Sequence, residues 1–438
     1  MQTQYFDATT GLLDRRVFSD ETIYQAELSR IFGRAWHFMC HESQIPHIGD
    51  YFMSWIGEDE VIAVRGRDGH IHVHLNTCPH RGNTVCRAEL GHAKSFFCSY
   101  HGWNFDLDGR LISVPGEEVF YRGGLDKQAW GLTSAAQVDS YQGFVFATLD
   151  AEAPALVDYL GWVGRLGIDL VASLGTVRFL DGVVKNRVQC NWKIAVDNLY
   201  DWYHVKVSHG SALKIGMMQE APLSLTEQMV LLGDYGHGIG GPGLSEANYQ
   251  ARAEQIRAGK GANQNPDITL KRRLNPESEA LLGPVGKRCF GHPNIFPNLW
   301  VATTSQVCLR IPRGPLETEL WWFSYEIDEM DLQERRNNLF AINHFFGPGG
   351  ILEQDDGENW SHSTRGARGT RSKTLPANLS MGIATNATGS DAPGQTRFET
   401  VVSEHAQRWT YQSWQDWMTA ESWQDLIANH STPPQGPV

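Results

Sequence analysis

Two short loops, each with one cysteine and one histidine, constrain this 438-residue chain more than any other feature. The first reads Cys78-Pro79-His80 and the second reads Cys98-Ser99-Tyr100-His101-Gly102-Trp103. Short β-rich runs and Gly/Asp turns surround both, which is typical of a compact all-β module. Two Cys and two His can bind zinc, but zinc sites usually place the cysteines in one loop and the histidines in another. The mixed loops therefore favour a different metal group.

Mixed pairs suit a [2Fe–2S] cluster in which two thiolates hold one iron and two imidazoles hold the other. The pattern resembles a Rieske centre whose cluster ligands are Cys78, His80, Cys98 and His101. Respiratory Rieske centres carry a disulfide across the two loops, but the matching positions here are Asn83 and Tyr100. We therefore expect no such bridge and a low-potential centre of the ferredoxin or oxygenase type.

A second group of potential metal ligands lies in residues 191–209, NWKIAVDNLYDWYHVKVSH. Asp201 and His204 are three residues apart, so they share one face of a helix. His204 and His209 are five apart, which places them roughly 140° apart on an ideal helix. Both can hold one metal only if the helix ends, kinks or carries a π-type bulge after His204. Taken alone, the segment also fits an amphipathic helix with two incidental histidines.

Beside a Rieske motif, this segment resembles the D-x-x-H-x-x-x-x-H motif of Rieske non-haem iron oxygenases. From about residue 36 to 360, the chain resembles the large (alpha) subunit of ring-hydroxylating oxygenases. The resemblance implies a mononuclear Fe(II) held by His204, His209 and a distant carboxylate. Two imidazoles and one carboxylate on one face leave the remaining positions open to O2 and substrate.

The third iron ligand is expected in residues 346–360, FGPGGILEQDDGENW. In the family's matching segment, the second Asp of the pair is the ligand, so we predict Asp356. The alternatives left open are Asp355, Glu353 and Glu358. Without the resemblance, such a run would be an acidic turn exposed to solvent.

The predicted fold class is α+β, and the resemblance implies an all-β Rieske domain inserted in a helix-grip-like catalytic domain with an antiparallel sheet. An N-terminal helical part of the catalytic domain is expected at residues 1–38, and the Rieske [2Fe–2S] domain at 39–155. The mononuclear iron catalytic domain is expected at 156–438. Helices are predicted near 20–37, 191–209, 329–346 and 402–419. Residues 234–287, rich in Gly, Asn and Pro, are expected to form a disordered loop or a lid over a site.

An aromatic substrate requires a largely apolar pocket. By position in the matched motifs, its lining is predicted to include Asn198, Leu199, Val205, Phe346 and Leu352, all of which also fit an ordinary core. The spacing from Asn198 to Asp201 resembles family members that act on aromatic carboxylates. Such an acid needs a cationic partner, for which Arg310 or Lys206 is available. An arginine near Arg310 also occurs in members without acidic substrates, so that residue alone does not decide the substrate.

The resemblance also implies how electrons reach the iron. In the family, the two metal sites of one chain are far apart, and electrons cross between neighbours in a head-to-tail alpha trimer. Asp201 would then bridge His204 of its own chain and His101 of the next, which fixes both tautomers. The chain shows no flavin or NAD motif, so a ferredoxin or reductase is the expected electron donor. The form of residues 346–360 is closest to members with a small beta subunit, which favours an α3β3 assembly.

Composition limits the other partners. Lys and Arg total 37 against 50 Asp and Glu, a formal net charge of −13, which argues against nucleic acid and anionic membranes. The longest apolar candidate, residues 161–175, is broken by Arg165 and Asp169, so no membrane span is predicted. The first residues contain no apolar core of a signal peptide, so we expect a cytoplasmic protein.

These features together predict the terminal oxygenase of a multicomponent dioxygenase. It would use O2 and electrons from a ferredoxin or reductase to cis-dihydroxylate an aromatic compound during aromatic degradation. A Rieske monooxygenase or demethylase remains open, because it would use the same metal ligands. A Rieske electron carrier is a further alternative, and the ordered His204, His209 and Asp356 motif argues against it. A structural zinc protein is another, which would be colourless where a Rieske protein is red-brown.

Overall fold

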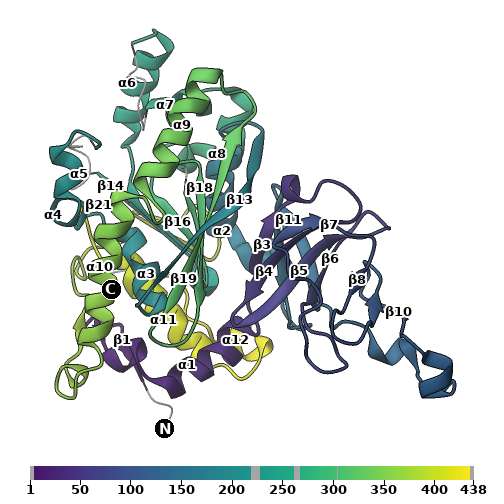
Figure 1. Cartoon of the computed structure of the whole chain (residues 1–438). Coiled ribbons are helices and arrows are strands. Elements are labelled where there is room, and N and C mark those ends of the chain that lie inside the picture. The colour runs from purple at the N-terminus through teal and green to yellow at the C-terminus, as the bar shows by residue number, and fades with distance from the viewer. Residues whose placement is uncertain (1–3, 219–226, 261–266, 303, 435–438) are drawn as a thin grey trace. The chain divides into compact units, whose positions relative to one another are not determined.

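The computed structural model describes residues 4–218, 227–260, 267–302 and 304–434. The chain divides into two compact units, Met1–Ile31 with Val157–Val438, and Phe32–Leu156 (Figure 1). The second unit is inserted in the sequence of the first. The first boundary lies at 31/32 rather than at 38/39, because strand β3 (His37–His41) already pairs with β12 (Phe144–Thr148) of the inserted unit.

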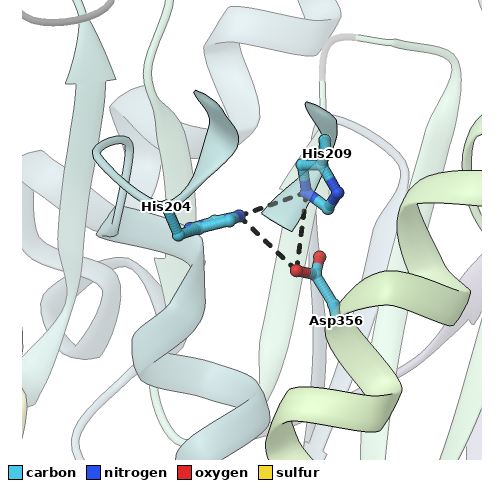
Figure 2. Close-up of side chains that lie close together, drawn as sticks. All are labelled: His204, His209 and Asp356. Carbon is cyan, nitrogen blue, oxygen red and sulfur yellow. Dashed lines mark hydrogen bonds and ion pairs between the residues drawn. The ribbon is translucent and has the colours of Figure 1, made fainter. Parts of the chain in front are cut away.

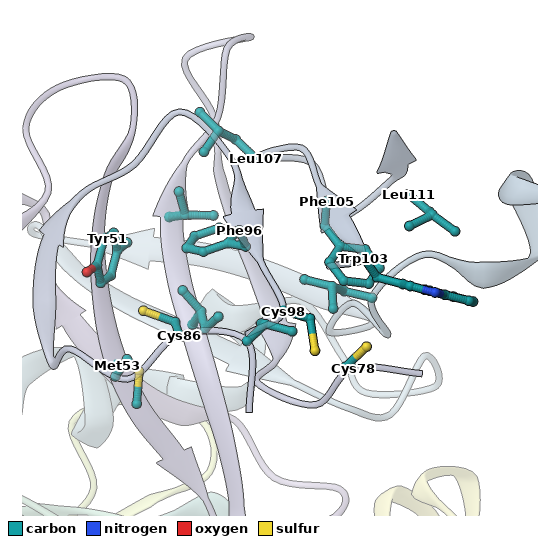
Figure 3. Close-up of a cluster of buried hydrophobic side chains, with 14 of the residues drawn as sticks. Tyr51, Met53, Cys78, Cys86, Phe96, Cys98, Trp103, Phe105, Leu107 and Leu111 are labelled. Carbon is teal, nitrogen blue, oxygen red and sulfur yellow. The ribbon is translucent and has the colours of Figure 1, made fainter. Parts of the chain in front are cut away.

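The inserted unit contains three small antiparallel sheets. Their orders are β11-β12-β3, β6-β5-β4-β7 and β10-β9-β8. The remaining strands are β4 (Asp50–Ile56), β5 (Asp59–Arg65), β6 (Ile71–Leu75), β7 (Leu90–His92), β8 (Phe96–Phe97), β9 (Asn104–Phe105), β10 (Leu111–Ser113) and β11 (Gln137–Tyr141). One buried apolar cluster includes Phe96, Trp103 and Phe105, and it also contains Cys78 and Cys98 (Figure 3). Both cysteine loops therefore rest on the same core.

The discontinuous unit is built on one eight-stranded antiparallel sheet, in the order β13-β19-β18-β17-β16-β15-β14-β21. The strands are β13 (Val177–Val188), β14 (Gln228–Gly233), β15 (Gly238–Pro242), β16 (His292–Ile295), β17 (Leu299–Ala302), β18 (Gln306–Pro312), β19 (Thr318–Ile327) and β21 (Gln395–Thr400). Strands β14 to β19 follow one another as a meander, so residues close in sequence meet across neighbouring strands. A small sheet joins β1 (Phe6–Asp7), β2 (Leu12–Leu13) and β20 (Ala377–Asn378).

Helices cover both faces of this sheet, so strands such as β14 and β18 are buried along their whole length. On one face, α2 (Leu156–Ala172) and α8 (Pro276–Gly286) pack on Met229, Leu231 and Ile239. The other face carries α3 (Trp192–Asp197), α10 (Ile351–Gly366) and α11 (His405–Thr419) (Figure 1). A curved antiparallel sheet around a long C-terminal helix is the α+β, helix-grip-like arrangement expected from the sequence.

The glycine-rich segment 234–287 is not one long loop where the structure describes it. It contains β15, and the helices α6 (Glu246–Arg257), α7 (Asp267–Arg273) and α8, while residues 261–266 lie outside the described ranges. The glycines of β15 are needed for packing. A Cβ atom at Gly240 would lie 2.9 Å from the ring of Tyr200, and one at Gly241 would lie 2.2 Å from Nε1 of Trp202. The segment that carries the histidines thus packs directly on the backbone of a central strand.

The helix predicted near 402–419 is confirmed as α11, whereas two other predicted helices are shorter than expected or interrupted. The segment 20–37 forms α1 (Glu21–Glu27) and a π-helical turn, Leu28–Phe32, before β3 begins. The segment 329–346 forms α9 (Leu332–Phe345), and α12 (Trp423–Asn429) follows α11. None of the helices in the described ranges has the length and apolar character needed to cross a bilayer.

Candidate metal centres and active site

The two cysteine loops share one backbone construction. In each loop, the cysteine N–H donates to the carbonyl five residues on, of Asn83 or Trp103, at 2.8 Å. The N–H of the glycine four residues on, Gly82 or Gly102, donates to the cysteine carbonyl at 2.9 Å. These glycines have φ values of +73° and +75°, which residues with a side chain rarely adopt. The glycines therefore allow each loop to turn tightly around its cysteine.

The four predicted cluster ligands lie together on these loops. The thiols of Cys78 and Cys98 are buried and interact with each other (Figure 3). The rings of His80 and His101 are 4.5 Å apart between centroids, and Nδ1 of His80 is buried with no hydrogen-bond partner among the residues that the structure describes. Two adjacent thiols beside two adjacent imidazoles fit the asymmetric ligand set of a Rieske cluster.

The Cys98 loop favours the thiolate, which is the form that binds iron. Nδ2 of Asn83 donates to Sγ of Cys98 at 3.6 Å, and the backbone N–H groups of Tyr100 and His101 also donate to this sulfur. Burial opposes the charge, but the hydrogen bonds outweigh it and lower the pKa of Cys98 overall. All seven cysteines are free thiols, and Cys86 lies in the apolar core, where its thiol contacts the carbonyl of Ala88.

In the catalytic unit, His204, His209 and Asp356 bring three donor atoms to one point (Figure 2). Nε2 of His204 lies 3.2 Å from Nε2 of His209 and 3.5 Å from Oδ1 of Asp356. Nε2 of His209 lies 3.4 Å from the same oxygen. Ligands about 2.1 Å from one metal, in adjacent positions, form a triangle with sides of about 3 Å. The three donors therefore fit one face of an octahedral iron site.

The helix is interrupted on both sides of the histidines, as their spacing requires. Helix α3 ends at Asp197, and a single turn, Asn198–Tyr200, follows it. The four-residue helix α4 (Val205–Ser208) has His204 at its N-cap and His209 at its C-cap. A new helix, α5 (Gly210–Lys214), begins directly after His209. The two imidazoles thus flank one short helical turn and can converge on a shared point.

Each of these imidazoles has a carboxylate at its other nitrogen. Nδ1 of His204 lies 3.6 Å from Oδ1 of Asp201, and Nδ1 of His209 lies 3.4 Å from Oδ2 of Asp355. Asp355 therefore lies behind His209 rather than in the donor triangle. Carboxylates in this position fix the tautomer of a metal-bound histidine. Burial lowers the pKa of His204, but Asp201 and Asp356 outweigh burial and raise it overall.

The residues predicted to line a pocket take different positions. Phe346 stacks on Trp322 at 5.0 Å and meets the edge of Trp300 at the same distance. The side chain of Asn198 forms a hydrogen bond with the carboxylate of Asp356, so Asn198 positions this proposed iron ligand. Leu199 and Leu352 are buried, Val205 is half-buried, Arg310 is buried on β18 and Lys206 is exposed.

Sequence reasoning missed the aromatic side chains that extend from the sheet beside these residues. Trp300 and Trp322 lie 5.3 Å apart on β17 and β19, and His292 packs 4.7 Å from both Trp300 and Trp202. The sequence feature that could have revealed them is an alternation of apolar and polar residues along the strands LWVATTSQVCLRIP and TELWWFSYEI. It could not be used, because both faces of these strands are buried.

Comparisons with known proteins agree with this arrangement. Residues 35–130 match the family model of the Rieske [2Fe–2S] domain, and residues 177–421 match that of the ring hydroxylating alpha subunit (catalytic domain). The chain belongs to the family of ring-hydroxylating oxygenase alpha subunits, whose members combine a Rieske cluster with a mononuclear iron.

Two sequence relatives and one solved structure are similar to this protein over nearly the whole chain. The biphenyl dioxygenase alpha subunit of Paraburkholderia xenovorans is 36% identical over 444 residues, which cover 96% of this chain and 94% of that protein. The benzene 1,2-dioxygenase alpha subunit of Pseudomonas putida is 33% identical, with 97% and 94% covered. A solved structure of naphthalene 1,2-dioxygenase with indole in its active site has a TM-score of 0.85 at 27% identity, covering 98% of this chain and 97% of that one.

The protein is accordingly the oxygenase subunit of an oxidoreductase that incorporates O2. When bound, the cluster supplies electrons one at a time, and the mononuclear iron supplies open coordination positions. The chain itself contributes two candidate ligand sets. It also contributes carboxylates placed to set the histidine tautomers, and an aromatic face on the sheet.

Proposed function

We propose that this chain is the terminal oxygenase subunit of a multicomponent dioxygenase that converts an aromatic ring to a cis-diol in aromatic degradation. The observation that carries the proposal is the triangle of His204, His209 and Asp356, which would hold one metal ion and leave its remaining positions to O2 and substrate. The nearby rings of Trp300, Trp322 and Phe346 favour a flat, apolar substrate. The relatives named for biphenyl, benzene and naphthalene support an aromatic substrate.

We assign the ligand roles accordingly. Cys78, His80, Cys98 and His101 hold the [2Fe–2S] cluster, and His204, His209 and Asp356 hold the mononuclear Fe(II). Asp201 is the residue that links the two centres. Its Oδ1 is buried and lies 3.6 Å from Nδ1 of His204, and it has no hydrogen-bond partner among the described residues. In a head-to-tail alpha trimer, the other oxygen of this partly exposed carboxylate would accept a hydrogen bond from His101 of a neighbouring chain.

The electron donor in this proposal is a ferredoxin or reductase. Its docking surface would be the exposed side chains around the cluster loops, which include the cations Arg81, Arg87 and Lys94. Arg110 is less available, because Asp106 and Asp108 pair with it. Acidic ferredoxins would be attracted by such a face, and the association would weaken with salt. A small beta subunit would complete an α3β3 assembly.

We also propose that the substrate is an aromatic carboxylate, as the short spacing from Asn198 to Asp201 suggests. The relatives named above take their names from hydrocarbons, so an acidic substrate would distinguish this chain from them. The alternative reaction is a single oxygenation or a demethylation. A quaternary ammonium Rieske monooxygenase shares the fold, with a TM-score of 0.65 at 18% identity, and the same donor triangle would serve that reaction.

A single-turnover experiment tests the reaction type. The reduced holoenzyme is mixed anaerobically with a panel of aromatic acids and hydrocarbons, O2 is admitted, and product masses are read. A gain of two oxygens and two hydrogens supports the dioxygenase. A gain of one oxygen, or loss of a methyl group, establishes the alternative. Full loading of the cluster without any mononuclear iron would instead indicate an electron carrier.

A further inference from the structure

One buried arginine differs from the others in the described residues. The other three buried arginines all donate hydrogen bonds to oxygen atoms. Arg273 and Arg408 each donate to two backbone carbonyls, those of Leu170 and Cys289 and those of Leu379 and Met381. Arg288 donates to the carbonyl of Leu244 and to the carboxylate of Glu399. Arg310 is 2% exposed, and its side chain has neither a hydrogen bond nor an ion pair with any described residue. Its guanidinium lies over the ring of Trp300, 5.3 Å from the centroid.

The unpaired charge is chemically unusual. A guanidinium stays protonated at any physiological pH, so Arg310 cannot avoid burial as an ion by losing its proton. Buried charges are normally paired, because a charge without a partner is strongly destabilising inside a protein. Nε and Nη1 of Arg310 and the indole Nε1 of Trp300 are all buried donors that find no acceptor in the described part of the chain. Three orphan donors on two adjacent side chains call for a ligand rich in acceptor oxygens.

The strand register places these donors on the active-site face of the sheet. Cys308 of β18 lies opposite Trp300 of β17 and Trp322 of β19. Side chains opposite each other, and those two apart in one strand, share a face, so Arg310 is on the face of both tryptophans. Phe346, four residues before Gly350 at the start of α10, stacks on Trp322 and therefore lies on this same face, and α10 in turn contacts α3.

Arg310 is also close to the iron-binding residues electrostatically. His292 interacts electrostatically with the charges of both Arg310 and His204. Glu353 interacts in the same way with the charges of Arg310 and Asp356. Glu353 is the nearby acid that could have neutralised the arginine. It is instead bonded to Asn186 at 3.4 Å and forms no ion pair with Arg310 among the described residues.

We propose that Arg310 is a specificity residue that binds the carboxylate of an aromatic acid, while the substrate ring lies against Trp300, Trp322 and Phe346. A guanidinium and a carboxylate match as a two-point hydrogen-bonded pair. The indole N–H of Trp300 can donate to the same acid group. The inference rests on the proposed aromatic substrate, and it names the residue that would select acids over the hydrocarbons of the named relatives.

Binding to the holoenzyme tests the inference separately from catalysis. Benzoate and biphenyl-4-carboxylate are titrated by calorimetry, each beside its amide, against wild type, Arg310→Lys and Arg310→Gln. We expect wild type to prefer the acids. Loss of a charged hydrogen-bonded pair should weaken acid binding roughly 10- to 100-fold in Arg310→Gln and less in Arg310→Lys. The amides should bind all three proteins similarly. Arg187→Gln, an exposed arginine on β13 of the same sheet, is the matched control and should bind like wild type.

The outcomes separate the two proposals. Equal acid binding by wild type and Arg310→Gln, or a wild-type preference for the amides, would overturn the role of Arg310. If the same preparation still dihydroxylates a hydrocarbon, the proposed function survives that result. If acids bind through Arg310 but no aromatic compound gains oxygen, the proposed reaction fails and the binding role stands. Circular dichroism and the cluster absorbance establish that each variant is folded, and Arg310→Lys retains the charge if Arg310→Gln does not fold.

Discussion

Glu27 on α1 and Lys193 on α3 form an ion pair that is completely buried, with Nζ 2.5 Å from Oε1 and side-chain exposures of 0% and 1%. Glu27 also accepts hydrogen bonds from Nε1 of Trp192 at 2.9 Å and from Nε1 of Trp414 at 2.8 Å. Three donors therefore satisfy one carboxylate. The pair connects the N-terminal helix with α3, which leads to the histidines proposed as iron ligands, and with α11.

The ion pair predicts a large effect of a single substitution. Glu27→Gln should lower the free energy of unfolding of this unit by about 3–5 kcal/mol, because it leaves the Lys193 charge buried without compensation. The double variant Glu27→Leu with Lys193→Met should recover much of that loss. Urea unfolding followed by circular dichroism measures both. Glu21→Gln, at an exposed site on the same helix, is the control, and an equal effect there would contradict the prediction.

The two neighbouring aspartates of α10 should behave differently. Asp356→Ala should remove the mononuclear iron and leave both cluster irons in place, because it deletes a member of the donor triangle. Asp355→Asn should keep the site but weaken iron binding about 10- to 100-fold, since Asp355 only supports Nδ1 of His209. Iron analysis with electron paramagnetic resonance of the reduced cluster checks both. Retention of full iron by Asp356→Ala would exclude it as a ligand.

Asp201 should matter for electron transfer more than for metal binding. Asp201→Asn is expected to keep both metals and to slow reoxidation of the reduced cluster about 10- to 100-fold, because an amide cannot replace the carboxylate at Nδ1 of His204. Stopped-flow absorbance of the cluster after mixing with O2 and substrate measures this rate. Unchanged reoxidation in a fully loaded variant would rule out the linking role.

Asn83 should tune the cluster. Its amide donates to Sγ of Cys98, and a hydrogen bond to a cluster thiolate stabilises the reduced state. Asn83→Leu should therefore lower the midpoint potential by about 20–60 mV, the one-electron equivalent of a typical hydrogen bond. Redox titration monitored by visible absorbance gives the value. A potential equal to that of wild type would mean that the backbone donors alone set it.

Asp197 should make stability depend on pH. Burial raises its pKa to about 8 from an ordinary value of 3.8, although the hydroxyl of Tyr411, 2.5 Å away, opposes the shift. Between about pH 4 and pH 8 the folded protein keeps a proton that the unfolded chain has released. The free energy of unfolding should consequently fall as pH rises through this window, by up to about 1.4 kcal/mol per pH unit.

The variant Asp197→Asn isolates this contribution, because it removes the titration and keeps the shape of the side chain. Its unfolding free energy should change less between pH 5 and pH 8 than that of wild type. Asp181→Asn, an exposed site in the same unit, should retain the wild-type slope. Denaturant unfolding at several pH values makes the comparison, and identical slopes for Asp197→Asn and wild type would contradict the assigned shift.

Several features could be predicted from sequence because they are local. The cluster loops depend on cysteines, histidines and glycines within a few residues of one another, and the end of the helical turn at His209 follows from helix geometry. The segment 234–287 was misread for the opposite reason. Its glycines resemble those of a loop, but Gly240 and Gly241 are needed because Tyr200 and Trp202 pack against a strand.

The sequence by itself determined the chemistry available to this protein: the two mixed Cys/His loops, the paired histidines and the adjacent acids of α10. The tertiary structure decided how these groups are used. Whether Asp355 or Asp356 faces the histidines depends on how α10 packs on the sheet, and residues far apart in the chain must meet for the donor triangle to form. The unpaired state of Arg310 is likewise a property of packing. A residue type specifies which bonds are possible, and only its neighbours in space decide which of them are made.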